Sequence, residues 1–359
     1  MSRQPRASGY FRTDYAQDLA LLATRFERRS LAVFIVALLA FPLVASPFQL
    51  DLACQVFLAS IGALSLMLLT GYAGQISLGH AGLIAAGAFT VGILFRETNA
   101  PFWVTLPAAA LVGALLGIIF GLPSLRLRGL YLAVSTLALH FVVIYLGGEY
   151  ESRWGFSTGI VIDPPTLGGV AISDGRVWYF ILLAAAAATL LISLNLLRAR
   201  TGRAWRAIRA HETVAEALGI GIAGYKVLAF VISSAITAVA GALFAYYRGF
   251  VSVEAFSLFL TIQYLAMVIV GGMGSLLGAL LGAGFVTVFP YVIEAALLAL
   301  PGAQRYADLL FAVNYAAFGL VMILFLVFEP LGLVGIWHRL QSYFLLWPFK
   351  HRSGSGSRR

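Results

Sequence analysis

Charged residues are scarce in this sequence, and lysine and cysteine are scarcer still. Only 11% of the 359 residues are charged, against about 25% in an ordinary soluble domain. Lysine occurs only at Lys226 and Lys350, and neither follows a glycine, so the phosphate-binding loop GxxxxGK[ST] is absent. Cys54 is the only cysteine, which excludes an internal disulfide and leaves no dithiol for redox chemistry.

Motifs of catalysis and metal binding are also missing. His211-Glu212 begins like the zinc motif HExxH, but the second histidine is absent, and the five histidines show no metal-ligand spacing. A Gly-x-Ser-x-Gly pattern occurs once, at 155–159, but it lies between two predicted spans and not at the strand-to-helix turn that a catalytic serine of this type needs. The residues therefore give no support to an enzyme, and we expect this chain to hold neither a metal nor a cofactor.

What fills the chain instead is apolar. Hydrophobic residues make up 61% of it, with a mean hydropathy of +0.92, which is more than a water-soluble core can bury. A membrane span needs about 20 mostly apolar residues. We predict an all-α polytopic membrane protein with about ten transmembrane helices. The candidate spans are 31–49, 52–70, 76–95, 102–121, 129–147, 177–197, 227–246, 258–274, 276–298 and 308–328.

The basic residues are sorted along the chain, which explains the net charge of +9 without nucleic acid. Of the 24 lysines and arginines, all but five lie in the four stretches 1–29, 122–129, 198–226 and 339–359. Ten spans place these stretches on one side of the membrane and the five single arginines on the other. This positive-inside pattern predicts a cytoplasmic N-terminus and C-terminus. Because the first 29 residues are polar and carry six arginines, we expect no cleavable signal peptide.

The acidic residues avoid the centres of the predicted spans. Those of the membrane region lie in loops or near span ends, as Asp51, Glu97 and Glu254 do. A charge at mid-membrane costs at least about 2.5 kcal/mol and is kept only for function. The chain thus shows no proton relay and no energy source of its own, so it is either a passive channel or is powered by another protein.

The predicted organisation has three parts. Residues 1–30 form a basic cytoplasmic segment, and 31–330 form the transmembrane domain with a cytoplasmic loop at 198–226. Residues 331–359 form a basic, largely disordered tail, because "HRSGSGSRR" is polar and rich in glycine and serine.

The 198–226 loop carries its own helix signals. Thr213 and Glu216 have capping-box spacing, and Gly219 suits the position just after a helix end. We predict a short helix at 214–218, preceded by another at 202–210, with apolar contacts from Trp205, Ile208, Ala215 and Leu218. A positive-inside anchor explains the arginines alone, whereas a docking surface for a soluble partner explains the short helix as well.

Several blocks closely resemble the LivM-type permease subunits of branched-chain amino acid ABC importers. They are "GYAGQISLGHAGLIAAGAF", "GLPSLRLRGLYLAVSTLAL", the segment from "GRAWRAIRAHETVAEALG" onward, and "AMVIVGGMGSLLGALLGAGF". Together they cover residues 50–330 in the family's order. "FEPLGLVG" at 328–335 matches the family's close, with Glu329 where arginine is common, and "WGFSTGI" at 154–160 stands where the family often has "TGGxNG".

The resemblance implies the ABC importer permease fold in a bacterial inner membrane. It also implies four kinds of partner: a second LivH-like permease, two ATPase subunits that bind ATP-Mg, a periplasmic binding protein, and lipid. The 198–226 loop would be the ATPase-coupling loop. Its implied coupling residues are Arg203, Arg206, Arg209, Glu212, Thr213, Ala215, Glu216, Ala217 and Gly219.

Two glycine-rich segments stand out inside apolar surroundings. Each glycine in a helix interior costs about 0.5–1 kcal/mol relative to alanine, so the segments need a reason. Small residues either let helices pack closely or permit a broken helix beside a cavity. Both interpretations stay open, the second being a translocation path or gate. The candidate residues are Gly71, Gly74, Gln75, Ser77, Gly79, His80, Gly82, Gly271, Gly272 and Gly274.

The sequence leaves three functions open. The first is the permease subunit of an ATP-driven importer for branched-chain or other hydrophobic amino acids, with urea or short-chain amides as alternative substrates. The second is a stand-alone channel, which glycine-rich segments also suit. The third is a structural membrane scaffold, whose deletion would abolish no uptake.

Overall fold

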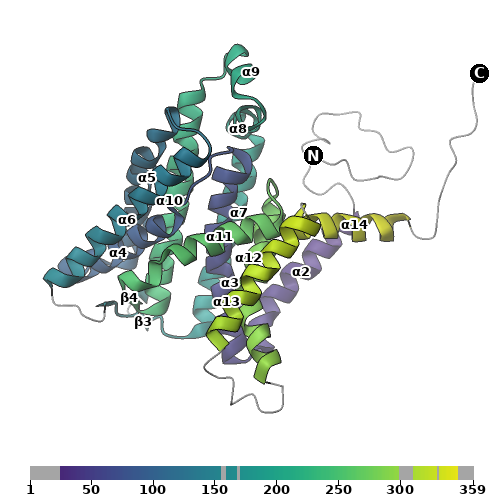
Figure 1. Cartoon of the computed structure of the whole chain (residues 1–359). Helices are drawn as coiled ribbons and strands as arrows, with labels where there is room; N and C mark the ends of the chain where they lie inside the picture. Colours follow the sequence, from purple (N-terminus) through teal and green to yellow (C-terminus); the bar gives the residue numbers. More distant parts are fainter. Residues whose placement is uncertain (1–24, 155–158, 168–169, 299–309, 330, 347–359) are drawn as a thin grey trace, which may run out of the picture.

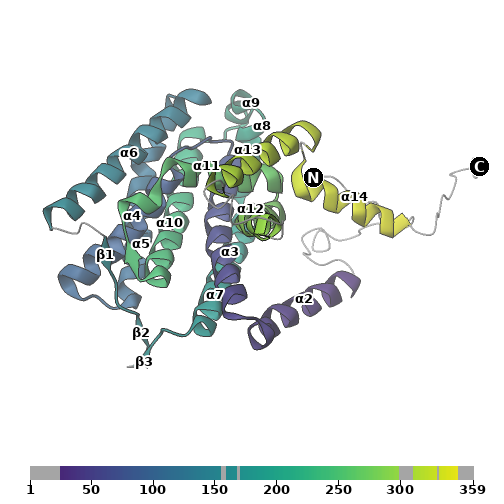
Figure 2. The same cartoon turned by 60° about the horizontal axis from the view of Figure 1, so that its bottom comes forward.

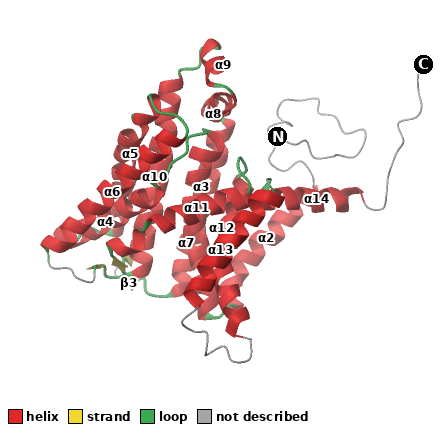
Figure 3. Ribbon diagram, viewed as in Figure 1, coloured by secondary structure: helices red, strands yellow, loops and turns green. Residues whose placement is uncertain are grey.

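The computed structural model describes residues 25–154, 159–167, 170–298, 310–329 and 331–346. Over these ranges the chain is mainly helical, as predicted (Figure 3). Outside them lie most of the predicted N-terminal segment, residues 155–158 of the "WGFSTGI" segment and the end of the predicted tail.

The helices follow the apolar runs closely. The first half of the chain forms α2 (Arg25–Val44), α3 (Pro47–Leu66), the π-helix η1 (Met67–Tyr72), α4 (His80–Thr98), α5 (Phe102–Gly121), the 3-10 turn η2 (Pro123–Leu125) and α6 (Leu130–Arg153). The second half forms α7 (Gly175–Arg198), α8 (Arg200–Ala210), α9 (Glu212–Ala217), α10 (Ile222–Arg248), the 3-10 turn η3 (Val253–Phe256), α11 (Leu258–Gly271), α12 (Leu276–Leu298), α13 (Leu310–Phe328) and α14 (Gly332–Leu346).

Within the described ranges, strands form only two short antiparallel pairs. β1 (Ile160–Val161) pairs with β4 (Phe250–Val251), and β2 (Thr166–Leu167) pairs with β3 (Val170–Ala171). The first pair ties the segment after α6 to the end of α10, far apart in sequence.

Seven helices of the described residues are long and apolar enough to cross a membrane, and three predicted spans are shorter. Those three are the apolar parts of α2, α11 and α13. With 14 residues, α11 is about 21 Å long, short of the roughly 30 Å hydrocarbon core. The polytopic architecture is confirmed, whereas the count of ten spans stays a prediction.

The core forms where glycines let helix backbones touch. α10 packs against both α4 and α5, and α3 packs against α7 and α12 (Figures 1 and 2). A Cβ atom added at Gly87 of α4 would lie 1.9 Å from the Ala238 carbonyl oxygen, and one added at Gly241 of α10 would lie 1.9 Å from that of Ile84. Only glycine fits at either place, so close packing between α4 and α10 depends on both residues.

The loops gather at two opposite ends of the bundle. α8 and α9 mark one end, at the top of Figure 1, and the β1–β4 pair lies towards the other. Arg128 reaches the α8–α9 end, where it pairs with Glu212. Tyr150 and Glu97 are hydrogen-bonded to each other at the opposite end. The predicted grouping of these loops is therefore observed, while the side that faces the cytoplasm stays a prediction.

The predicted tail differs from the structure in its first half. Residues 332–346 form helix α14, which packs against α11 and α12 before leading away from the bundle in Figure 1. Glu329 stands where the family commonly has arginine, and its carboxylate forms an ion pair with Arg339 at 2.8 Å. This pair ties the middle of α14 to the end of α13. Residues 332–346 of the predicted tail are therefore helical, whereas "HRSGSGSRR" lies outside the described residues.

Candidate functional site: the α8–α9 loop and the broken helix beneath it

The 198–226 loop folds into two helices, as predicted. α8 spans Arg200–Ala210 and α9 spans Glu212–Ala217. Trp205, Ile208 and Ala215 are buried, and the Trp205 indole donates to the Tyr225 carbonyl at 2.9 Å. Three of the four predicted apolar contacts are thus confirmed. The loop is anchored on the start of α10.

The predicted capping box is wrong. α9 begins at Glu212, and its N-cap is His211, which makes no capping hydrogen bond with its side chain. Thr213 therefore lies inside the helix. The predicted end is right: Gly219 has a φ of +80°. Its amide donates to the Glu216 carbonyl at 2.9 Å and the Ile220 amide to that of Ala215 at 3.1 Å. This is the Schellman pattern that favours glycine.

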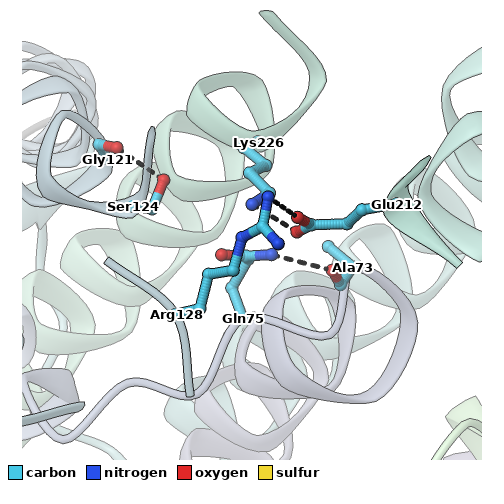
Figure 4. A network of polar contacts seen from close by, with 7 residues as sticks. All are labelled: Ala73, Gln75, Gly121, Ser124, Arg128, Glu212 and Lys226. Atoms are coloured by element: carbon cyan, nitrogen blue, oxygen red, sulfur yellow. Dashed lines mark hydrogen bonds and ion pairs between the residues drawn. The ribbon is translucent and has the colours of Figure 1, made fainter. Parts of the chain in front are cut away.

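Glu212 connects α9 to two other elements. Its carboxylate pairs with Arg128 at 2.9 Å and with Lys226, near the start of α10 (Figure 4). The Lys226 side chain is only 4% exposed and that of Glu212 19%. An unpaired buried charge is costly, so this pair fixes where α9 lies. Glu212 was a predicted coupling residue, and the structure shows it facing inward.

The outer surface of α9 is apolar and exposed. Val214 is 55% exposed and Leu218 74%, so the prediction that Leu218 packs inside the loop was wrong. Glu216 and Ala217 are exposed beside them. Among the described residues Glu216 has no ion-pair partner. A helix held rigidly at its base therefore presents two large apolar side chains and one carboxylate to the outside.

The three predicted arginines bind backbone carbonyl groups. Arg203 donates to the Arg198 carbonyl at 3.0 Å, and Arg206 to those of Gly202 at 3.1 Å and Leu197 at 3.2 Å. Arg209 reaches across to the Gly71 carbonyl at the end of η1. The first two therefore stabilise the turn from α7 to α8, whereas Arg209 joins the loop to a membrane span.

Residues 73–79 break the membrane helix at this place. The α3–η1 helix ends at Tyr72, and α4 starts only at His80. Gly74 has a φ of +70°. The Gln75 side-chain amide donates to the Ala73 carbonyl at 3.2 Å (Figure 4). The Thr70 hydroxyl donates to the Gln75 backbone carbonyl at 3.0 Å. The expected broken helix is present, and its own side chains bind the freed backbone groups.

Other residues of the first glycine segment serve close packing. A Cβ atom at Gly79 would lie 2.4 Å from the Phe120 ring, and one at Gly82 would lie 2.9 Å from the Cα atom of His140. Ser77 is buried and accepts from the Gly79 amide at 3.3 Å. His80 is buried with its ring 4.8 Å from that of Tyr264. Close packing is therefore confirmed for Gly79 and Gly82, whereas the translocation path or gate stays a prediction.

The second glycine segment meets the first. Gly272 and Gly274 have φ of +114° and +89°. The Gly274 amide lies 3.2 Å from the Met67 sulfur, and a Cβ atom there would lie 3.2 Å from Arg209. Gly271 packs on Gly278, where a Cβ atom would lie 2.0 Å from the carbonyl oxygen. The two segments, far apart in sequence, thus both contact the Arg209 side chain, which stays exposed on its other side.

A cavity of about 560 Å³ opens between the loop and the broken helix. Gly74, Gln75 and Ile76 line one wall, and Arg209, His211 and Glu212 line another. Sequence reasoning missed Arg128 and Lys226 as members of this site. Lys226 carried a signal, since it is one of two lysines and opens an apolar run. Arg128, which pairs with the same Glu212 carboxylate, had no signal in the sequence that would place it beside the 198–226 loop.

The fold and the site together define a multi-pass membrane permease. Seven described helices meet the requirements of a span, and the polar groups at the α8–α9 end brace helices against one another. The family model for the permease component of branched-chain amino acid transport systems matches residues 49–326. This chain belongs to that family.

Curated relatives agree. The chain is 34% identical to the high-affinity branched-chain amino acid transport permease LivM of Salmonella typhimurium, over 73% of this chain and 67% of that protein. It is 35% identical to LivM of Escherichia coli, over 70% and 66%, and 31% identical to a probable LivM of Methanocaldococcus jannaschii, over 63% and 66%. The match spans about two thirds of these relatives' length. No solved structure matches this chain significantly.

Proposed function

We propose that this chain is the permease subunit of an ATP-driven importer for branched-chain or similar hydrophobic amino acids. It would form the translocation path with a second, homologous permease in a bacterial inner membrane, and a binding protein would deliver the substrate. Family membership and relatives named as high-affinity branched-chain amino acid permeases support this proposal.

The exposed surface of α9 is the observation that supports docking of a separate ATPase, and so an ATP-driven transporter. Val214, Glu216 and Leu218 protrude from a helix that the Glu212–Lys226 pair holds in place. An anchor at the membrane surface needs neither the Glu212–Lys226 ion pair nor apolar side chains that point away from the bundle. A groove on a separate ATPase subunit accounts for both, since a short rigid helix transmits the movement of its partner.

The test uses the complex reconstituted with its ATPases and binding protein. Glu216→Lys and Leu218→Asp should each abolish leucine uptake and the stimulation of ATP hydrolysis while leaving membrane insertion intact. Glu254→Lys is the matched control, because Glu254 is exposed at the opposite end. Uptake that persists in both α9 variants, without ATP, would show a stand-alone channel and overturn the proposal.

The substrate class has its own test. Uptake of labelled leucine, isoleucine and valine should exceed uptake of urea and acetamide by the same complex. The reverse order would keep the ATP-driven mechanism and replace amino acids by amides as the substrate.

A further inference from the structure

A pocket of about 280 Å³ lies between α3, α10, α11 and α12, in the half of the bundle away from α8 and α9. Gln55 of α3, Arg248 at the end of α10, Gln263 of α11 and Tyr291 of α12 supply its polar groups. Its size lies just below the range of pockets that hold drug-sized ligands, so it suits a molecule as small as an amino acid.

The polar groups of this pocket are partly unpaired. Arg248 is exposed at the end of α10 and lies 5.9 Å from the centroid of the Tyr247 ring, but it pairs with no carboxylate among the described residues, and Gln263 makes no hydrogen bond there. Polar side chains within membrane segments almost always face protein or a water-filled cavity, because contact with lipid is expensive. This pocket is therefore a place for water and a polar ligand rather than for lipid tails.

Gln55 is held in a fixed orientation. Its amide nitrogen donates to Asp51 at 2.7 Å, and its amide oxygen accepts from the Tyr291 hydroxyl at 3.2 Å. Asp51 also accepts from the Tyr247 hydroxyl. An amide oxygen has two lone pairs, so the Gln55 oxygen keeps one for a ligand. The pocket thus offers a cation at Arg248 and a positioned acceptor at Gln55.

The rest of the lining is mostly apolar, with two further hydroxyl groups from Tyr264 and Thr287. Its apolar residues are Leu58, Ala59, Phe244, Leu260, Met267, Val286 and Pro290. Methionine adapts its shape to different apolar partners, which suits side chains that differ only in branching. One lining therefore combines a cation, a hydrogen-bond acceptor and an apolar surface, which is the complement of a zwitterion with an aliphatic side chain.

We propose that this pocket binds the transported amino acid in the outer half of the path. Arg248 receives the α-carboxylate, because a guanidinium binds a carboxylate through two parallel hydrogen bonds. The Gln55 oxygen accepts from the ammonium group, and the side chain lies against Phe244 and Met267. This proposal rests on the proposed function, since it names a contact site for that substrate.

The experiment measures equilibrium binding of radiolabelled L-leucine to the permease–ATPase complex in nanodiscs, without the binding protein. Leucine should bind with a dissociation constant in the millimolar range or below. Leucinol, which lacks the carboxylate, should compete at least about tenfold less well, because it cannot bridge to Arg248. Arg248→Gln should weaken leucine binding by about the same factor.

Arg153→Gln is the matched control, because Arg153 lies near the same end in an exposed pair with Glu149. It should bind leucine as the wild type does. Copurification of the ATPases checks that each variant is folded and assembled. Equal binding by the two variants, equal competition by leucinol, or no binding up to about 10 mM would each overturn the pocket assignment. If ATP still drives leucine uptake in that case, the proposed function is retained and only the assignment of this pocket is rejected.

Discussion

Arg209 and Gly71 are joined by a hydrogen bond although 138 residues separate them in sequence. The guanidinium comes from the end of α8 and the carbonyl from the end of η1, where the first long span breaks. The Gly274 backbone lies against the same guanidinium. One side chain therefore connects the proposed docking loop with both glycine segments, and we predict that a movement of α8 is passed to these two non-helical connections between membrane helices.

Arg209→Gln should separate ATP hydrolysis from transport. Glutamine is too short to reach the Gly71 carbonyl, so the loop still docks but no longer moves the broken helix. We expect leucine uptake to fall about tenfold or more, the loss of one charged hydrogen bond being worth roughly 1.5–3 kcal/mol, while ATP hydrolysis continues. Uptake and hydrolysis are measured together in proteoliposomes.

Arg203→Gln is the control for that change. Arg203 donates only to the Arg198 carbonyl within its own turn, so its loss should leave the ratio of uptake to hydrolysis unchanged. An Arg209 variant that behaves like the Arg203 variant would show that the hydrogen bond to Gly71 carries no signal.

Glu212→Gln should destabilise the fold through its buried partner. The substitution keeps the shape of the side chain but leaves the Lys226 ammonium without a neutralising charge at 4% exposure. Breaking a buried pair costs about 3–5 kcal/mol, and we expect somewhat less, because Glu212 keeps contact with water. The check is the midpoint of thermal unfolding in detergent, with exposed Glu216→Gln as the control.

A double variant distinguishes this cause from lost packing. Glu212→Gln combined with Lys226→Met removes both charges and should recover much of the stability, because no buried ammonium is then left without a partner. If the two changes are simply additive, the ion pair does not position α9.

The sequence predicts local features of this fold well and long-range ones poorly. Hydropathy located the helices, and the backbone freedom of glycine placed Gly219 at the end of α9. The capping box failed because Glu212 is drawn inward by Lys226, so the helix starts before Thr213. Neither the short length of α11 nor the bond from Arg209 to Gly71 has a local signal, because each depends on which helices become neighbours.

Gly87→Ala should disrupt the packing of α4 on α10. The added Cβ atom would lie 1.9 Å from the Ala238 carbonyl oxygen, which belongs to a rigid backbone. Overpacking typically costs about 1–3 kcal/mol, and a clash with backbone places this case at the upper end. The amount of folded protein recovered in detergent, measured by size-exclusion chromatography, should fall sharply.

Gly148→Ala in α6 provides the opposite expectation. The nearest atom to its new Cβ would be 3.7 Å away, an ordinary contact, and alanine favours a helix over glycine by about 0.5–1 kcal/mol. This variant should be at least as stable as the wild type. Similar losses in both variants would mean that the α4–α10 contact is looser than the structure shows.

Tyr247→Phe should weaken the half of the bundle away from α8 and α9, where α3, α10 and α12 share one polar network. The Tyr247 hydroxyl donates to Asp51, and Asp51 also accepts from Gln55, which in turn contacts Tyr291. A hydrogen bond to a charged group contributes about 1.5–3 kcal/mol, so the unfolding midpoint in detergent should drop. Tyr225→Phe is the control on the same helix, because the Tyr225 hydroxyl makes no hydrogen bond to the described residues. If water at this end of the bundle solvates Asp51 equally well, the two variants will have the same unfolding midpoint. Gln55 will then be free to turn away from the pocket that it lines.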